Sequence, residues 1–308
     1  ESFVFGYLTR CPMKPDNPEQ LNFELATSAK QIDKYTLEFK LRDGVKFHDG
    51  KPFTGEDVKF SLETLRQLHP RAATSFREVT AIETPDPLTV VLKLANPAPY
   101  LIMALSGYES PMLPKHIFGQ GDIKTHPNAN NPIGTGPFKF VQWEKGQFIR
   151  LDRNPDYWRK GQPYLERIVA RFIADPGTRT AAMEKGEAHF AAFGAVPWAD
   201  MGRISKLPHI GVDTRGYEMI NPLMMLELNH KKPPLDNVKV RQAISYAIDR
   251  QFIIDNIWFG YGKVATGPIS SNFAPLGLYN PDVKKYQVKD GVKLANQLLD
   301  EAGLKKDA

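Results

Sequence analysis

The 308-residue sequence has very little cysteine, because Cys11 is the only one in it. This excludes an internal disulfide and any cysteine-rich metal site. Long apolar runs are also missing: the longest, at residues 101–105 and 223–226, fall far short of the roughly eighteen residues that a membrane-spanning helix needs. Hydrophobic residues still make up 42% of the chain, so we expect a sizeable folded core rather than disorder.

A concentrated positive charge is absent as well. The formal net charge is +5 and the pI is near 9.0, but lysine and arginine are spread thinly along the chain. No window holds the basic cluster that binding to a nucleic acid or an anionic membrane surface would require. We therefore expect no nucleic-acid partner, and the composition indicates a mildly basic soluble protein.

Sequence motifs for catalysis are missing too. The chain has no H-E-x-x-H, no G-x-S-x-G and no G-x-x-x-x-G-K-[ST] motif, and its seven histidines are dispersed without helical metal-ligand spacing. Gly134 and Gly136 begin like a dinucleotide-binding loop, but Lys139 stands at the third glycine position, which favours a tight turn before a strand. We expect no catalytic centre, no cofactor and no metal held by protein ligands.

Acidic pairs and exposed-looking aromatics have structural explanations. The pairs at residues 56–57 and 300–301 lie where helix ends are expected, so capping or solvation explains them better than acid–base catalysis. Tyr157, Trp158 and Trp198 could serve as sugar platforms, but the turn signal before the first two favours core packing.

The clearest local pattern lies at residues 35–65. Apolar residues alternate over 35–42, a turn pair follows at 43–44, and the alternation resumes at 45–47 before a second turn at 49–50. Thr54 then offers a helix N-cap with Asp57 in the capping-box position, and an apolar stripe follows. The pattern predicts a hairpin and then a helix.

Further strands and helices are expected along the rest of the chain. Strands and helices are mixed throughout, which indicates an α/β or α+β protein without internal repeats. We predict strands at 88–94, 138–140, 147–151 and 168–173 and a buried strand at 224–228; the helices are expected at 99–105, 176–186, 240–248, 250–258 and 292–302.

Three long phrases resemble the extracytoplasmic solute-binding protein family 5, the peptide/nickel-type substrate-binding proteins of ABC transporters. The first is YTLEFKLRDGVKFHDGKPFTGEDVKFSL at residues 35–62. The second is PIGTGPFKF at 132–140, followed by LDRNPDYW at 151–158. The third is VRQAISYAIDR at 240–250. The phrases occur in the family's order, and the resemblance extends over essentially the whole chain.

The resemblance implies an α/β architecture, the two-lobed periplasmic-binding-protein type II fold, with an extra subdomain in the first lobe. Residues 1–220 would form most of the large first lobe, with 21–120 as the extra subdomain and 130–220 as the lobe's core. Residues 221–308 would begin the second lobe. Because family members run to roughly five hundred residues, we expect the chain to be truncated at both ends.

The resemblance also implies a function. It is typical of a bacterial carrier without enzymatic activity, exported with a removed signal peptide to the periplasm or another extracytoplasmic place. Such a carrier is a monomer that captures a short peptide or similar polar solute between its lobes and delivers it to an ABC permease through a transient contact. A periplasmic hydrolase, and a carrier of a nickel chelate, an opine or a sugar, remain the alternatives.

Two loops of the first lobe are implied to line the ligand cleft, at residues 68–76 and 105–110. Arg71 would pair with a ligand carboxylate through two donors, although a solvated loop charge is an equal alternative. Two further residues lie near the expected hinge. The implied ligand-binding residues are Arg71, Phe76, Tyr108, Glu109 and Ser110 from the loops and Tyr217 and Asn221 from the hinge.

Overall fold

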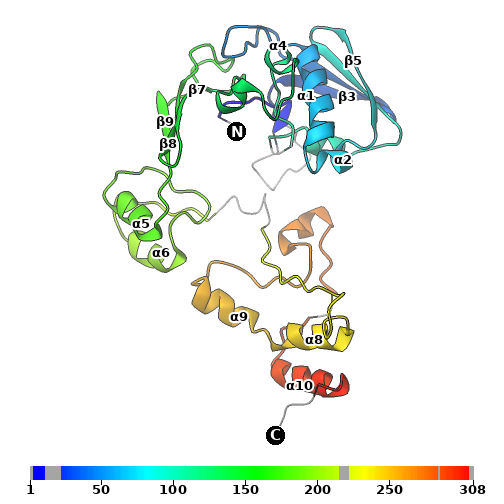
Figure 1. Cartoon of the computed structure of the whole chain (residues 1–308), viewed down its shortest axis with the longest axis vertical. Coiled ribbons are helices and arrows are strands. Elements are labelled where there is room, and N and C mark those ends of the chain that lie inside the picture. Colours follow the sequence, from blue (N-terminus) through cyan, green and yellow to red (C-terminus); the bar gives the residue numbers. More distant parts are fainter. Residues whose placement is uncertain (1–2, 11–21, 108, 215–221, 284, 305–308) are drawn as a thin grey trace. The chain divides into compact units, whose positions relative to one another are not determined.

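The computed structural model describes residues 3–10, 22–107, 109–214, 222–283 and 285–304 (Figure 1). The chain divides into two compact units, residues 1–172 (unit 1) and 173–308 (unit 2). The expected hinge near residue 220 falls partly outside the described residues, and the lobe boundaries stay a prediction.

Unit 1 is built around a four-stranded antiparallel sheet. Its strand order is β3-β4-β6-β5, so β4 and β6 are the central strands. The strands are β3 (Ala26–Asp33), β4 (Thr36–Leu41), β5 (Val79–Asp86) and β6 (Thr89–Leu94). The alternation in β4 has its predicted effect, because Leu37, Phe39 and Leu41 are all buried in the main core.

Helix α1 (Gly55–Leu68) covers this sheet through contacts with β5 and β6. It begins as predicted: the backbone N–H of Thr54 donates to the Asp57 carboxylate over 2.9 Å, the reciprocal half of a capping box. The predicted stripe of Val58, Leu62 and Leu65 is buried against the sheet. The periodicity therefore predicted both the strand and the helix correctly.

The predicted pairing of residues 45–47 with β4 is wrong. Both edges of β4 are occupied by β3 and β6, so no edge is left for a third strand. Residues 45–53 instead close on themselves, because Phe47 N donates to Lys51 O over 2.8 Å and Phe53 N to Val45 O over 2.9 Å. This small turn buries the side chains of Val45, Phe47 and Phe53.

A second, three-stranded antiparallel sheet follows in unit 1. Its strands β7 (Phe138–Glu144), β8 (Phe148–Arg153) and β9 (Arg167–Arg171) confirm the three short strands expected there. The turn between β7 and β8 contains Gly146 at φ +77°, a conformation that favours glycine. The remaining elements of unit 1 are β1 (Thr9–Arg10), β2 (Asn22–Phe23), α2 (Ala72–Ser75), α3 (Leu101–Ala104), α4 (Lys115–Phe118) and η1 (Pro127–Asn130).

The glycine pair before β7 forms a close-packed turn against residues 3–5. Gly136 N donates to Val4 O over 2.8 Å, and a Cβ atom on Gly134 would lie 2.1 Å from the same oxygen. Side chains are therefore excluded at both positions by backbone contact. This confirms the tight turn that the sequence predicted in place of a dinucleotide loop.

The described secondary-structure elements of unit 2 are all helices, joined by long loops. Helix α10 (Gly291–Glu301) packs against α8 (Val238–Ala247), and Gly291 allows the approach because a Cβ atom there would lie 2.4 Å from Tyr246 O. The expected helices at 176–186, 240–248 and 292–302 are confirmed, and 250–258 is a short α-helix that widens into a π-helical turn. The elements are α5 (Pro176–Glu184), α6 (Trp198–Ile204), α8 (Val238–Ala247), α9 (Arg250–Phe252), η2 (Ile253–Ile257), η3 (Ser271–Leu276) and α10 (Gly291–Glu301).

The predicted buried strand at 224–228 is wrong. The segment has no strand partner among the described residues, and Met224 is 80% exposed. Met225 and Leu226 are also exposed. A strand is stabilised by pairing and by burial on a face, and the described part of the chain supplies neither here. The apolar run alone therefore predicted a buried segment where the side chains are exposed.

His48 holds the glycine turn through both ring nitrogens. Gly134 N donates to Nδ1 over 3.3 Å, so Nε2 carries the proton and donates to Gly136 O over 3.0 Å. This arrangement requires a neutral ring. Burial lowers the pKa of His48; the charge of Lys139 adds to the decrease, while the bond to Gly136 opposes it.

We predict that His48 makes unit 1 sensitive to acid. A lowered folded-state pKa means that stability is complete above the unfolded value of about 6.5 and is lost as the pH falls through the folded pKa. The measurement is the free energy of unfolding at several pH values for the original chain and for His48→Gln, which can keep one donor and one acceptor. The variant should lose less stability on acidification, and parallel pH profiles would contradict the role of His48.

Candidate ligand-binding site

The two loops that were expected to line a cleft lie together in unit 1. Loop A (residues 68–76) follows α1, and loop B (residues 105–110) follows α3. Ser75 Oγ donates to Glu109 Oε2 over 2.6 Å, and Arg71 Nε lies 3.3 Å from Glu109 Oε1. A single carboxylate from loop B therefore connects two side chains of loop A.

Arg71 presents most of its side chain to solvent, with 62% exposed, whereas Glu109 is largely covered. Because the Arg71 side of the pair lies mainly in solvent, the pair contributes at most about 1 kcal/mol to stability. The guanidinium group is thus held in place without being buried, and an incoming carboxylate can share it with Glu109 or replace Glu109. The pair offers one cation and one anion side by side, which suits a ligand that carries both charges.

Phe76 and Ser110 do not reach the surface. Phe76 is 1% exposed within the main core, and Ser110 is fully buried with Oγ donating to Ser106 O over 3.3 Å. These side chains attach the two loops to the core. A direct contact of either side chain with a ligand stays a prediction.

The other expected site residues are not placed. Tyr108, Tyr217 and Asn221 lie outside the described residues. Their contacts with a ligand stay predictions.

Loop B is also joined to α1 through two buried polar side chains. Ser61 Oγ donates to Asp57 O over 2.6 Å and accepts from Leu113 N over 2.7 Å. Asp57, whose Oδ2 atom caps α1 at Thr54, also accepts from Lys115 N through its Oδ1 atom, over 3.0 Å. The segment that leaves loop B is therefore attached to the same helix from which loop A emerges.

A cluster of arginines around Trp158 lies in unit 1 and was not anticipated. The guanidinium carbons of Arg42 and Arg159 lie 4.2 and 4.7 Å from the centre of the Trp158 ring. Arg159 and Arg10 both pair with the buried Glu24, over 2.9 and 3.3 Å. These residues come from distant parts of the chain, so no local pattern could reveal them. Trp158 packs partly against the main core, which confirms the core-packing interpretation for this residue.

Unit 2 contains an aromatic stack. The ring of Trp198 lies 5.1 Å from that of Tyr261 and 6.5 Å from that of Trp258, with interplanar angles of 27° and 14°. All three rings are half-buried. Trp198 is thus held by other aromatics and keeps part of its surface open.

Among the described residues, no three histidine, cysteine, aspartate or glutamate side chains lie close enough to hold a metal ion together. No described helix has the length and apolar character needed to cross a membrane.

The family model described as bacterial extracellular solute-binding proteins, family 5 Middle, matches residues 20–308. The chain belongs to this family. Among the curated family 5 proteins, the oligopeptide-binding protein AppA of Bacillus subtilis is 31% identical over 99% of this chain and 55% of its own length.

Solved structures of other family 5 proteins support the fold. NikZ from Campylobacter jejuni, in complex with Ni(L-His), is 28% identical with a TM-score of 0.79 over 98% of this chain and 58% of its own. AgaA of the agrobacterial strain R10, in complex with agropinic acid, is 30% identical with a TM-score of 0.73 and the same coverages. The expected fold class, mixed α/β of the two-lobed periplasmic-binding-protein type II, is confirmed by these neighbours. The chain spans a little over half the length of the relatives it matches.

We predict that the packing of Phe76 in the core stabilises unit 1. Phe76→Ala should lower the free energy of unfolding of unit 1 by about 3–5 kcal/mol, because it leaves a cavity under loop A. Leu68→Ala, at the end of α1 where loop A begins and with Leu68 40% exposed, should cost well under about 1 kcal/mol. Urea denaturation of both variants makes the comparison, and a loss for Phe76→Ala as small as that for Leu68→Ala would contradict its burial.

Proposed function

We propose that the protein is the extracytoplasmic substrate-binding component of an ABC importer and carries a short peptide or a similarly sized polar solute. Membership of the extracellular solute-binding family supports this most strongly. AppA is named an oligopeptide-binding protein, and its structure from Bacillus subtilis holds a nonapeptide. In this proposal the protein is a monomer without enzymatic activity that meets its permease only transiently.

The proposed mechanism is capture by closure of two lobes. Residues 1–220 would contribute most of the first lobe, and residues 221–308 the beginning of the second. A closed form is favoured by the ligand because only that form contacts the ligand from both sides. No reactive group is needed, which agrees with a sequence that lacks the catalytic motifs sought above.

In the first lobe, the proposed contact is the pair of Arg71 and Glu109. Arg71 would hold a ligand carboxylate through its planar guanidinium, and Glu109 would meet a ligand amine. Phe76 and Ser110 would position the loops that carry this pair. Tyr108, Tyr217 and Asn221 are proposed as further contacts.

A carrier of a metal chelate or an opine is the second candidate. NikZ is described with Ni(L-His) and AgaA with agropinic acid, and both match this chain about as well as AppA does. A paired cation and anion suits such charged solutes as well as it suits a peptide. Native mass spectrometry of the purified protein would identify what co-purifies with it and so decide between these ligand classes.

We predict that Arg71→Ala weakens binding of ligands with a free carboxylate. Calorimetric titrations would use a dipeptide, a tripeptide and a nonapeptide, each with a free and with an amidated C-terminus. A desolvated contact should cost the free-acid peptides about 1.5–3 kcal/mol and the amidated peptides almost nothing.

Arg77→Ala is the matched control, since Arg77 is similarly exposed and also pairs with a glutamate, Glu78. Equal affinity in Arg71→Ala and Arg77→Ala would remove Arg71 from the site. Steady hydrolysis of any bound peptide by the pure protein would favour the hydrolase alternative and overturn the carrier proposal.

A further inference from the structure

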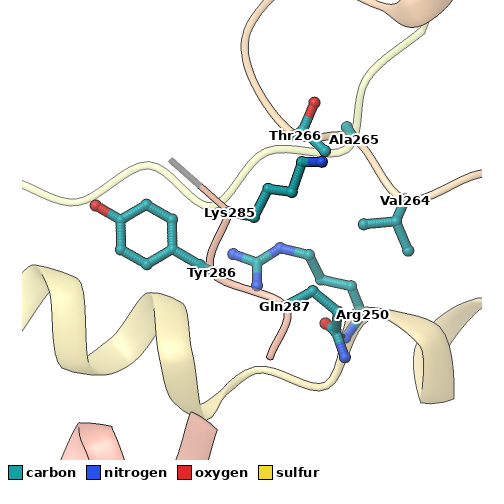
Figure 2. Close-up of a pocket in the computed structure, with 7 residues that line it drawn as sticks. All are labelled: Arg250, Val264, Ala265, Thr266, Lys285, Tyr286 and Gln287. Atoms are coloured by element: carbon teal, nitrogen blue, oxygen red, sulfur yellow. Dashed lines mark hydrogen bonds between the residues drawn. The ribbon is translucent and has the colours of Figure 1, made fainter. Parts of the chain in front are cut away.

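A pocket in unit 2 lies apart from every residue assigned above. It is formed where the segment 264–266 faces the segment 285–287, and Arg250 enters it from the start of α9 (Figure 2). Its empty space is about 380 Å³, part of which is open solvent. The enclosed part therefore has room only for a small molecule.

The charges that line this pocket are all positive. Arg250 and Lys285 are its two ionisable cations, and no aspartate or glutamate is among the lining residues. Neither cation forms an ion pair with a carboxylate in the described part of the chain. The nearest acidic neighbour in sequence, Asp249, keeps its negative charge and accepts from Phe252 N over 2.9 Å and from the Gln287 amide over 3.2 Å. It does not line the pocket, and the two cations that do so favour an anion.

Arg250 is held in position by hydrogen bonds that leave two nitrogens of its guanidinium group available. Its Nη1 donates to Ser245 O over 2.8 Å and to Ile248 O over 3.3 Å, and its backbone N donates to Gln287 Oε1 over 2.9 Å. Within the described residues, Nε and Nη2 have no protein partner. A guanidinium fixed at one nitrogen and open at the others is prepared to bind a planar anion.

The rest of the lining is mainly apolar. Val264 and Ala265 present aliphatic groups, and the Tyr286 ring is fixed by an edge contact with Tyr246 at 4.9 Å. The Thr266 hydroxyl is engaged with the Tyr279 hydroxyl over 3.0 Å. Figure 2 shows the Lys285 side chain extending toward the 264–266 segment. An anion bound here would thus carry a short hydrocarbon part beside its charge.

We propose that this pocket binds a small monocarboxylate. The carboxylate would lie between Arg250 and Lys285, and a chain of two or three carbons would lie against Val264 and Ala265. An aliphatic wall disfavours inorganic phosphate, whose oxygens need donors on all sides, and the planar fork of arginine matches a carboxylate. The site is separate from the proposed solute contact at Arg71, so either proposal can fail without the other.

The test is titration of the protein with propionate, followed by calorimetry and by NMR shifts of the residues that line the pocket. Propionamide is the neutral control, since it has the same shape without the charge. Propionate should bind saturably and propionamide should not. Absence of saturable propionate binding, or equal binding of propionamide, would overturn the proposal.

Substitutions locate the site. Arg250→Gln and Lys285→Gln should each weaken propionate binding by about tenfold or more, as expected for loss of a bond to a charged group. Lys289→Gln is the matched control, because Lys289 is exposed on the same segment but does not line the pocket. Arg250 also holds two backbone carbonyls, so Lys285→Gln, which leaves those bonds intact, is the deciding variant. Equal affinity in Lys285→Gln and Lys289→Gln would refute the assignment.

Discussion

The packing of α1 on the sheet of unit 1 is the constraint on which the candidate site depends. Strand β4 is paired on both edges, and its inward side chains meet the buried stripe of α1 in one core. Because α1 is fixed by this contact and by its Thr54 cap, the loop at its far end is also fixed. That loop carries Arg71 and Ser75, and Glu109 completes the arrangement from a segment more than thirty residues away.

The described part of unit 2 is packed less extensively than the sheet and helix of unit 1. Its helices bury only narrow surfaces, and the apolar segment at Met224 to Leu226 lies exposed and without a strand partner. Family 5 relatives are nearly twice as long as the matched region, so in those proteins this part of the fold coexists with much additional polypeptide. An apolar segment forms a buried strand only where another part of the chain pairs with it and covers it.

Local patterns were sufficient for β4 and for the start of α1, but they were insufficient for the contacts between distant residues. The period of two predicted β4 and the Thr54 signal predicted the start of α1, because each depends on residues close in sequence. The pairing of β4 with β6, the burial of Phe76 and the contact of Arg71 with Glu109 depend on residues far apart. Family resemblance brought the two loops to attention, but it did not distinguish side chains that face the core from those that face solvent.

The buried hydroxyl of Ser61 and the carboxylate of Asp57 have a consequence for kinetics. They attach the segment after loop B to the helix before loop A through hydrogen bonds that lie within the chain and involve no ligand. A ligand that binds at this surface therefore does not have to create these bonds. First contact here should then be a simple bimolecular collision, whose rate rises linearly with ligand concentration. Any rate that levels off at high concentration would report a motion elsewhere in the protein.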